Sequence, residues 1–368
     1  MSIFENVYKN KKVIITGNTG FKGSWLSIWL NELGAEVHGI SNKVPTNPSN
    51  FKVSNLEEKV RYHVIDVRNY DELSKRIIEI QPDFIFHLAA QALVYDAYKD
   101  PLYTYQTNVL GTINVLETLK SIKKRCVAVM ITSDKCYENV EWIWGYKETD
   151  ILGGKDPYSS SKACAELAIY SYYNSFFSKE EFSNIHISSA RAGNVIGGGD
   201  WADNRIIPDA INSWYNNTKL EIRSPRATRP WQHVLEPLSG YLHLGLKLYS
   251  DKNISGESFN FGPTQDSNYS VKKLLDELSI NLENLEWVDK SESKVYNEAG
   301  LLKLNCDKAL SVIGWKPNLS FKETVKFVSD WYINFKISSD NMYDFNVKQI
   351  EEFIEIAKKN NLNWAQND

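Results

Sequence analysis

The chain has 368 residues, of which 42% are hydrophobic and 24% are charged, so we expect a globular protein with one large or two modest domains. Lysine and arginine number 42 against 46 aspartates and glutamates, and the formal net charge of −4 argues against binding to nucleic acid or to an anionic membrane. The four cysteines form no Cys-x-x-Cys pair, and no secretion signal or membrane-spanning apolar stretch stands out, so we expect a cytoplasmic protein with reduced thiols.

The first half of the chain alternates short apolar runs with helical patterns. The run 12–16 ends at a glycine and is followed by helical spacing over 24–33. Further apolar runs lie at 36–40, 62–65, 84–88, 127–131 and 186–190. Because parallel strands need a long crossover between them, this alternation predicts an α/β fold of the Rossmann type, a doubly wound parallel sheet with helices on both faces.

After about Arg191 the pattern becomes irregular, until 258–261 resembles one more strand and 347–360 one more amphipathic helix. We therefore predict a nucleotide-binding domain over 1–195, to which 232–262 adds late sheet elements. A smaller, interleaved α/β domain over 196–368 would bind the substrate.

A glycine-rich turn joins the first strand to the first helix and reads Gly17-Asn18-Thr19-Gly20-Phe21-Lys22-Gly23. Glycines at these steps let backbone N–H groups approach a pyrophosphate, and the helix N-terminus favours its negative charge. The spacing is Gly-x-x-Gly-x-x-Gly rather than Gly-x-Gly-x-x-Gly, but the position between strand and helix predicts a dinucleotide site.

The acidic residue expected about 20 positions further on is absent, because the second strand ends in Ile40-Ser41-Asn42-Lys43. Either Ser41 holds the adenosine ribose less tightly, or Lys43 lies near a 2′-phosphate, so these residues leave NAD and NADP open. Asp66, after the third strand, is either a partner for the adenine amino group or a turn former.

Six Tyr-x-x-x-Lys pairs occur, so this spacing alone selects nothing. Only Tyr158 and Lys162 lie between a strand that ends in polar groups and the next strand, on a helix opened by Pro157 and lined with small residues. The two side chains would lie one turn apart on one helix face, where the ammonium of Lys162 could lower the pKa of the Tyr158 phenol. We predict that this pair is functional and that the other five are solvated or packed.

Two polar groups of residues accompany this pair. Ser133, Asp134 and Lys135 follow the strand at 127–131 and supply a hydroxyl, an acid and an amine at the carboxyl edge of the sheet, although a plain polar turn would look the same. Arg205 and the cluster Arg223, Arg226 and Arg229 suit a diphosphate-bearing substrate or form a solvated basic loop. The histidines show no metal-binding spacing, so no metal is predicted.

Together these residues resemble the extended branch of the short-chain dehydrogenase/reductase superfamily and, within it, the CDP-glucose 4,6-dehydratases. The most specific motifs are Phe21-Lys22-Gly23, Ser133-Asp134-Lys135 and Arg229-Pro230-Trp231-Gln232-His233-Val234, and the resemblance extends over 16–26, 87–91, 132–137, 156–158, 191–201 and 229–238. It implies an NAD-retaining lyase that turns CDP-D-glucose into CDP-4-keto-6-deoxy-D-glucose and water, for deoxysugars of bacterial surface polysaccharide such as O-antigen.

The resemblance also implies roles for residues. Tyr158, kept as phenolate by Lys162, would take the proton of the sugar 4-hydroxyl, Ser133 would orient that hydroxyl, and Asp134 would protonate the departing 6-hydroxyl. Lys135 would be either a neutral base for the C5 proton or a cation that stabilises the enolate. The implied cofactor contacts are Gly17, Thr19, Gly20, Phe21, Lys22, Gly23, Ser41, Asp66, Val67, Leu88, Ala89, Ala90, Tyr158 and Lys162, and the implied substrate contacts are Asn194, Arg205, Arg223, Arg229 and His233.

Three alternatives remain at this point. A nucleotide-sugar 4-epimerase would need only Tyr158, Lys162 and the cofactor, and a dehydratase could act on a different nucleotide hexose. A cofactor-sensing binding protein is the alternative from another class. Relatives in this superfamily often dimerise through the helix that carries Tyr158 and the one near 103–119, so a homodimer or a dimer of dimers is expected.

Overall fold

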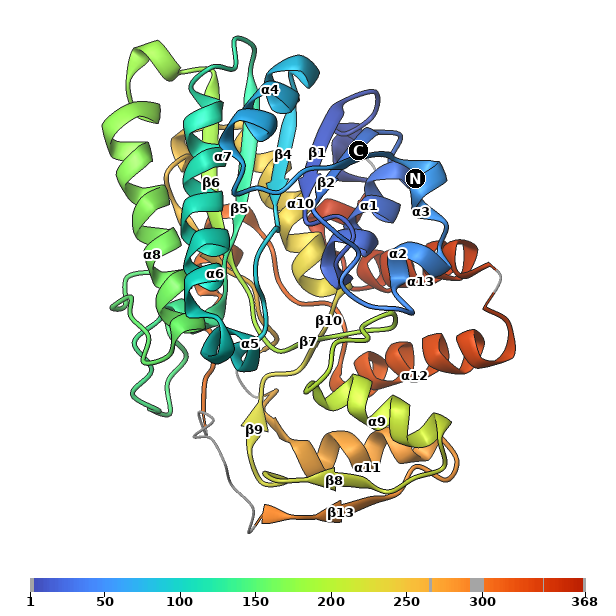
Figure 1. The fold of residues 1–368 in the computed structure, drawn as a ribbon. Coiled ribbons are helices and arrows are strands. Elements are labelled where there is room, and N and C mark those ends of the chain that lie inside the picture. Colours follow the sequence, from blue (N-terminus) through green and yellow to red (C-terminus); the bar gives the residue numbers. More distant parts are fainter. Residues whose placement is uncertain (1–2, 265–266, 292–300, 340, 367–368) are drawn as a thin grey trace.

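A seven-stranded parallel sheet forms the centre of the protein (Figure 1). The computed structural model describes residues 3–264, 267–291, 301–339 and 341–366, and in this part the sheet has the order β11-β6-β5-β4-β1-β2-β3. Its strands are β1 (Lys12–Thr16), β2 (Glu36–Ser41), β3 (Arg61–Val64), β4 (Phe84–His87), β5 (Cys126–Ile131), β6 (Ile185–Arg191) and β11 (Ser258–Asn260). The predicted doubly wound parallel sheet is therefore confirmed.

Helices cover both faces of this sheet, because successive residues of each strand point to opposite sides. On β1, Val13 and Ile15 belong to one hydrophobic core, whereas Ile14 belongs to the other. The Ile14 face is packed by α4 (Tyr70–Ile80), α7 (Gly111–Leu119) and α8 (Pro157–Tyr172), and the opposite face by α1 (Phe21–Glu32), α10 (Leu235–Ser250) and, over α1, α13 (Met342–Lys359).

The sheet order also fixes where a ligand can bind. From β1 the chain builds outward through β2 and β3, then crosses back to place β4 on the other side of β1. The strand order therefore reverses direction between β1 and β4, and open α/β sheets bind ligands at the carboxyl ends of the strands beside such a switch point.

Apart from α10, β11 and α13, the residues after β6 form smaller units at one end of the sheet, below it in Figure 1. In the part of the chain that the structure describes, three two-stranded sheets pair β7 (Val195–Ile196) with β10 (Gln232–His233), β9 (Thr228–Arg229) with β12 (Tyr269–Ser270), and β8 (Leu220–Ile222) with β13 (Trp287–Asp289). The remaining α-helices are α2 (Asn50–Val53), α3 (Leu56–Lys59), α5 (Val94–Lys99), α6 (Pro101–Tyr105), α9 (Ile206–Tyr215), α11 (Val271–Asn281) and α12 (Phe321–Ile337).

Two helices begin earlier than their apolar spacing predicts. Helix α1 starts at Phe21 rather than near residue 24, and α13 starts at Met342 rather than at residue 347. For α1 the reason is that its first turn belongs to the glycine-rich segment, which has no apolar periodicity. The first-turn N–H groups of α1 thus lie inside the predicted nucleotide turn.

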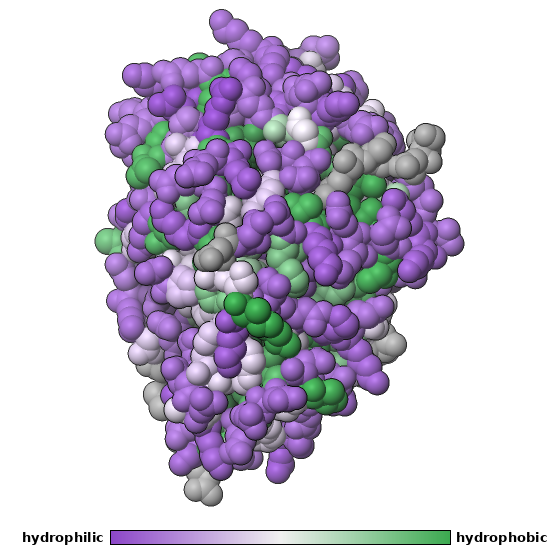
Figure 2. Space-filling model, turned by 90° about the vertical axis from the view of Figure 1, so that its right-hand side faces the viewer, coloured by the Kyte–Doolittle hydropathy of each residue, from purple (hydrophilic) through white to green (hydrophobic). Residues whose placement is uncertain are grey.

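Within the described ranges, every helix is too short or too polar to cross a membrane. The face in Figure 2 is mostly hydrophilic, with hydrophobic residues in small separate patches.

Candidate active site

The glycine-rich turn packs against the loop that follows β4. Gly17 has a left-handed φ of +77°, and a Cβ there would lie 2.8 Å from the backbone nitrogen of Ala89. Thr16 holds the same loop, because its hydroxyl accepts a hydrogen bond from the Ala89 N–H at 3.2 Å. At Gly23 a side chain would overlap the carbonyl oxygen of Gly17. Only glycine permits this close approach, which places 88–90 beside the first turn of α1.

The residues predicted at the ends of the second and third strands, Ser41 and Asp66, form hydrogen bonds with other protein groups. The Ser41 hydroxyl donates to Asn18 Oδ1 at 2.8 Å and accepts from the Thr19 N–H at 3.3 Å, so it braces the glycine-rich turn. Both carboxylate oxygens of Asp66 bind Arg68, which lowers the pKa of Asp66 to about 2. Val67, which follows Asp66, is buried. An adenosine would therefore meet a preformed Asp66–Arg68 pair at this edge.

The polar triplet after β5 meets Tyr158 of helix α8. Ser133 donates to Asp134 Oδ1 at 3.0 Å and also forms a hydrogen bond with Tyr158. Asp134 is buried and accepts from Asn194 Nδ2 at 3.2 Å. The Lys135 ammonium lies 3.8 Å from Asp134 Oδ1, and about a third of its side chain is exposed. The structure thus brings the triplet, Tyr158 and Asn194 together.

Local signals in the sequence fix the N-terminus of helix α8 just before Tyr158. Asp156 caps its N-terminus by accepting from the Ser159 N–H at 3.0 Å, and Pro157 fills the first helical position. Tyr158 and Lys162 follow one turn apart on the buried face. The local sequence therefore fixes the face that the two side chains share.

Burial and neighbouring charges shift the pKa values in this site. Burial raises the pKa of Tyr158 to about 12, against the lowering effects of the Ser133 hydrogen bond and the Arg205 charge. Burial lowers the pKa of Lys162 to about 8, with Glu166 opposing. The phenol thus keeps a high pKa despite the expected influence of Lys162, because desolvation is the largest effect.

The Lys22 side chain reaches the same site from the glycine-rich turn. Although part of this side chain is exposed, burial lowers the pKa of Lys22 to about 7, and the charges of Arg205, Lys162 and Lys135 add to that effect. Asp134 acts in the opposite direction. Three lysines and one arginine therefore surround a single reaction centre, which favours an anionic ligand.

The predicted substrate residues do not all lie in this cluster. Arg205 acts on both Tyr158 and Lys22 and is held by an ion pair with Asp200 at 3.0 Å. Arg223 is exposed after β8, and Arg229 is half-buried on β9.

His233 lies in the hydrophobic core. Its ring is fully buried and packs against Trp25 and Phe327 at centroid distances of 6.2 and 5.3 Å. Burial lowers the pKa of His233 to about 3. The burial of His233 results from packing of α1 and α12 against β10, and such packing between distant segments leaves no local signal in the sequence.

The sequence analysis missed three residues whose ion pairs hold the site residues in place: Glu166, Asp200 and Arg191. Glu166 forms a buried ion pair with Arg191 beneath Lys162. One signal could have found Glu166, since Tyr158, Lys162 and Glu166 follow each other at intervals of four residues on one helix face. Nothing comparable marks Asp200.

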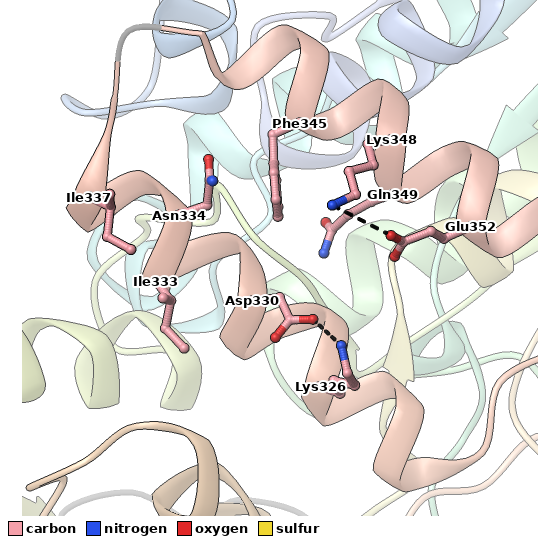
Figure 3. A pocket seen from close by; sticks show the side chains of 9 residues that line it. All are labelled: Lys326, Asp330, Ile333, Asn334, Ile337, Phe345, Lys348, Gln349 and Glu352. Atoms are coloured by element: carbon pink, nitrogen blue, oxygen red, sulfur yellow. Dashed lines mark hydrogen bonds and ion pairs between the residues drawn. The ribbon is translucent and has the colours of Figure 1, made fainter.

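A separate surface pocket lies between α12 and α13 (Figure 3). It has a volume of about 240 Å³ and contains none of the predicted site residues. Its charged side chains pair with each other, Lys326 with Asp330 and Lys348 with Glu352, the latter at 3.9 Å. Within the described residues, no group of three or more histidine, cysteine, aspartate or glutamate side chains is arranged to hold a metal ion.

Comparison with known proteins shows the family to which the chain belongs. The chain is 42% identical over 355 residues to CDP-glucose 4,6-dehydratase of Salmonella typhimurium, which covers 96% of this chain and 98% of that protein. UDP-glucose 4-epimerase of Mycoplasma pneumoniae is 22% identical, over 88% of this chain and 97% of that protein.

Solved structures share the fold. An epimerase from Methanothermobacter thermautotrophicus superposes with a TM-score of 0.78 at 24% identity, over 91% of this chain and 96% of that one. The dTDP-glucose 4,6-dehydratase of Bacillus anthracis, solved with NAD, gives 0.72 at 20% identity, over 88% and 97%. Residues 14–328 match the family described as GDP-mannose 4,6 dehydratase. The chain therefore belongs to this dehydratase family, among the epimerases and dehydratases of the short-chain dehydrogenase/reductase superfamily.

Proposed function

We propose that the chain is a CDP-D-glucose 4,6-dehydratase, which forms CDP-4-keto-6-deoxy-D-glucose and water and supplies deoxysugar for surface polysaccharide such as O-antigen. The relative from Salmonella typhimurium, similar over nearly the whole chain, supports the substrate. The observation that carries the reaction is the hydrogen-bonded series from Tyr158 through Ser133 to Asp134. It joins a phenol suited to removing the proton of a sugar hydroxyl to a carboxyl suited to protonating a departing hydroxyl.

The residues present fit NAD as the retained cofactor. The close approach of Gly17 to Ala89 and of Gly23 to Gly17 holds the backbone of the turn and of the loop 88–90 together, and a side chain at either glycine would force them apart. The turn 17–23, the loop 88–90, and Tyr158 with Lys162 would hold the cofactor. When bound, NAD supplies a hydride acceptor, and later a hydride donor, next to the sugar ring.

Tyr158, Ser133 and Asp134 have separate roles in the two proton transfers. As the phenolate, Tyr158 takes the proton of the sugar 4-hydroxyl, which Ser133 orients. Burial raises the pKa of the free phenol to about 12, and the positive charge of Arg205 acts against burial by favouring the phenolate. Oxidation at C4 makes the C5 proton acidic, and Asp134 then delivers a proton to the 6-oxygen as water leaves.

Asp134 and Lys135 act together in the loss of water. The Lys135 ammonium nitrogen lies 3.8 Å from Asp134 Oδ1, so both side chains reach the same region of the sugar. During elimination Lys135 accepts the C5 proton, and Asp134 gives its own proton to the leaving 6-oxygen. Proton return from Lys135 to Asp134 restores the starting pair.

Exposed apolar side chains support a homodimer. On α6, on the segment 106–110 and on α8 these are Leu102, Leu110, Leu167 and Tyr170, all more than half exposed. The helices that carry them pack side by side. A second copy that covers this face would form a bundle of paired helices.

We also propose the division into a nucleotide-binding part over 1–195 and a substrate-binding part over 196–368, with the stretch 232–262 completing the sheet. The pairing of β11 with β6 and the packing of α10 on β5 support the interleaving. The free thiols of Cys126, Cys136, Cys164 and Cys306 support a cytoplasmic location.

The test is a substrate screen with purified protein. CDP-glucose, dTDP-glucose, GDP-mannose and UDP-glucose are each incubated with it, and the 4-keto product is followed by its absorbance in alkali and by mass spectrometry. We expect a ketone, with loss of water, from CDP-glucose, and NAD released on denaturation. Ketone from another nucleotide sugar alone would change the substrate, interconversion of the C4 epimers would establish an epimerase, and no reaction at all would reject the proposal.

A further inference from the structure

A buried ion pair lies directly under the candidate active site. Glu166 of α8 and Arg191 at the end of β6 are 2.7 Å apart, and their side chains are 2% and 3% exposed. Glu166 follows Lys162 by one helical turn and Tyr158 by two, so it continues the same face of the helix. A buried pair of this kind gives little net stability compared with well-packed apolar side chains, so stability alone does not explain its presence.

Glu166 is tied to the strand that delivers the polar triplet. Its carboxylate accepts hydrogen bonds from Thr132 Oγ1, from Ser189 Oγ at 2.8 Å and from Arg191 Nη2. Thr132 immediately precedes Ser133. The chain segment that enters the triplet is therefore fastened to helix α8 by this carboxylate.

Arg191 is tied to the segment that leaves the triplet. Its Nη1 donates to the hydroxyl oxygen of Tyr137 at 2.8 Å, and the Tyr137 hydroxyl donates in turn to Asn260 Oδ1 at 2.8 Å. The two nitrogens of one guanidinium thus contact Glu166 and Tyr137 at the same time. The residues on both sides of 133–135 are anchored to one ion pair.

The charge of Glu166 also acts on Lys162. Four titratable groups face Lys162 from the elements around it: Glu166, Cys136, His87 and Lys22. Burial lowers the pKa of His87 to about 3 and raises that of the Cys136 thiol, so both are uncharged near neutral pH. Lys22 opposes the charge on Lys162. Glu166 is thus the main group that favours the ammonium form of Lys162.

We propose that Glu166 and Arg191 are positioning residues of the active site: they fix the Ser133–Lys135 turn against helix α8, and Glu166 keeps Lys162 charged. The assignment rests on the proposed function, because it uses the catalytic roles of Ser133, Asp134 and Lys162. It separates into a geometric part, carried by the fork of Arg191, and an electrostatic part, carried by the charge of Glu166.

Two variants test the two parts. Glu166→Gln keeps the shape and removes the charge, so the alkaline limb of the kcat profile should move to lower pH, on the order of one unit. Arg191→Lys keeps the charge but cannot contact Glu166 and Tyr137 together, so kcat should fall roughly tenfold with the limb unmoved and KM little changed. Ser258→Ala is the matched control, since Ser258 contacts the pair at 3.1 and 3.4 Å but does not touch the triplet's flanks.

A substrate-free measurement separates this inference from the proposed function. Nuclear magnetic resonance of carbon-labelled lysine gives the pKa of Lys162 in the whole protein without substrate. We expect that pKa to fall in Glu166→Gln and to stay in Arg191→Lys and Ser258→Ala. An unmoved pKa in Glu166→Gln would overturn the electrostatic part even if ketone formed, and a wild-type kcat in folded Arg191→Lys would overturn the geometric part. If Glu166→Gln does not fold, Glu166→Asp replaces it. The shorter side chain keeps the negative charge but moves it away from Lys162, so the pKa of Lys162 should again fall.

Discussion

The substitution Gly193→Ala tests the position of Asp134 without altering any polar group. Gly193 follows β6 and Ala192, and a methyl group built on it would overlap the carboxyl carbon and both oxygens of Asp134. Asp134 is buried and held by Ser133 and Asn194, so its carboxyl can yield only by turning away from its present partners. Relief of the overlap requires a shift of about 1 Å. Misplacement of a reacting group by that distance costs about a hundredfold in rate, or about 2.7 kcal/mol in the barrier.

The loss should fall on one step of the reaction. Oxidation of the sugar at C4 uses Tyr158 and Ser133, whereas loss of water uses Asp134. In Gly193→Ala we therefore expect kcat for ketone formation to drop about a hundredfold, while the nicotinamide absorbance of the first turnover rises and then persists because the oxidised sugar is not dehydrated. Stopped-flow absorbance and quenched samples measured by mass spectrometry follow the two steps separately.

Gly262→Ala is the matched control. A methyl group there meets Cys306 Sγ and Leu304 Cβ at 3.5 Å, an ordinary contact, so kcat should stay within about twofold of the wild type. Thermal melting shows whether each variant is folded. A folded Gly193→Ala protein with wild-type kcat would refute the reasoning, because it would show that the carboxyl of Asp134 is not needed where the structure places it.

Three further outcomes are expected. Tyr158→Phe should lower kcat by about 10² to 10⁴ with CDP-glucose binding, measured by calorimetry, little changed; near-normal turnover would remove Tyr158 from the proton transfer. Burial raises the pKa of Glu236 to about 8, so the folded state retains this proton to higher pH than the unfolded chain, and stability should decline as the pH rises from about 5 to 8. Thermal melting of Glu236→Gln should show a flatter pH dependence over that window, and an unaltered slope would contradict the assignment. Leu167→Glu places a charge on an exposed apolar face of α8 and should shift the protein to monomers in light scattering, whereas a persistent dimer would place the interface elsewhere.

Some features followed from the sequence alone because their causes are local. A run of β-branched residues forms a buried strand wherever it lies, and the strands at 12–16 and 127–131 are found within one residue of their predicted bounds. The glycine-rich turn needs glycine for its own backbone conformation at Gly17. The shared face of Tyr158 and Lys162 is a consequence of helical spacing.

Other features depend on which distant segments pack together, and these only the tertiary structure decided. The resemblance placed His233 among the expected substrate contacts, and in the folded chain its ring packs against Trp25 of α1 and Phe327 of α12. Glu166 and Arg191 lie 25 residues apart on a helix and a strand, and their contact exists because β6 lies beside β5 under α8. Local periodicity determines which face of an element is apolar, whereas sheet order and side-chain packing determine which charges become neighbours. For that reason the sequence predicted the strands, the nucleotide turn and the tyrosine–lysine pair, and the folded chain added the carboxylate and guanidinium that hold them in place.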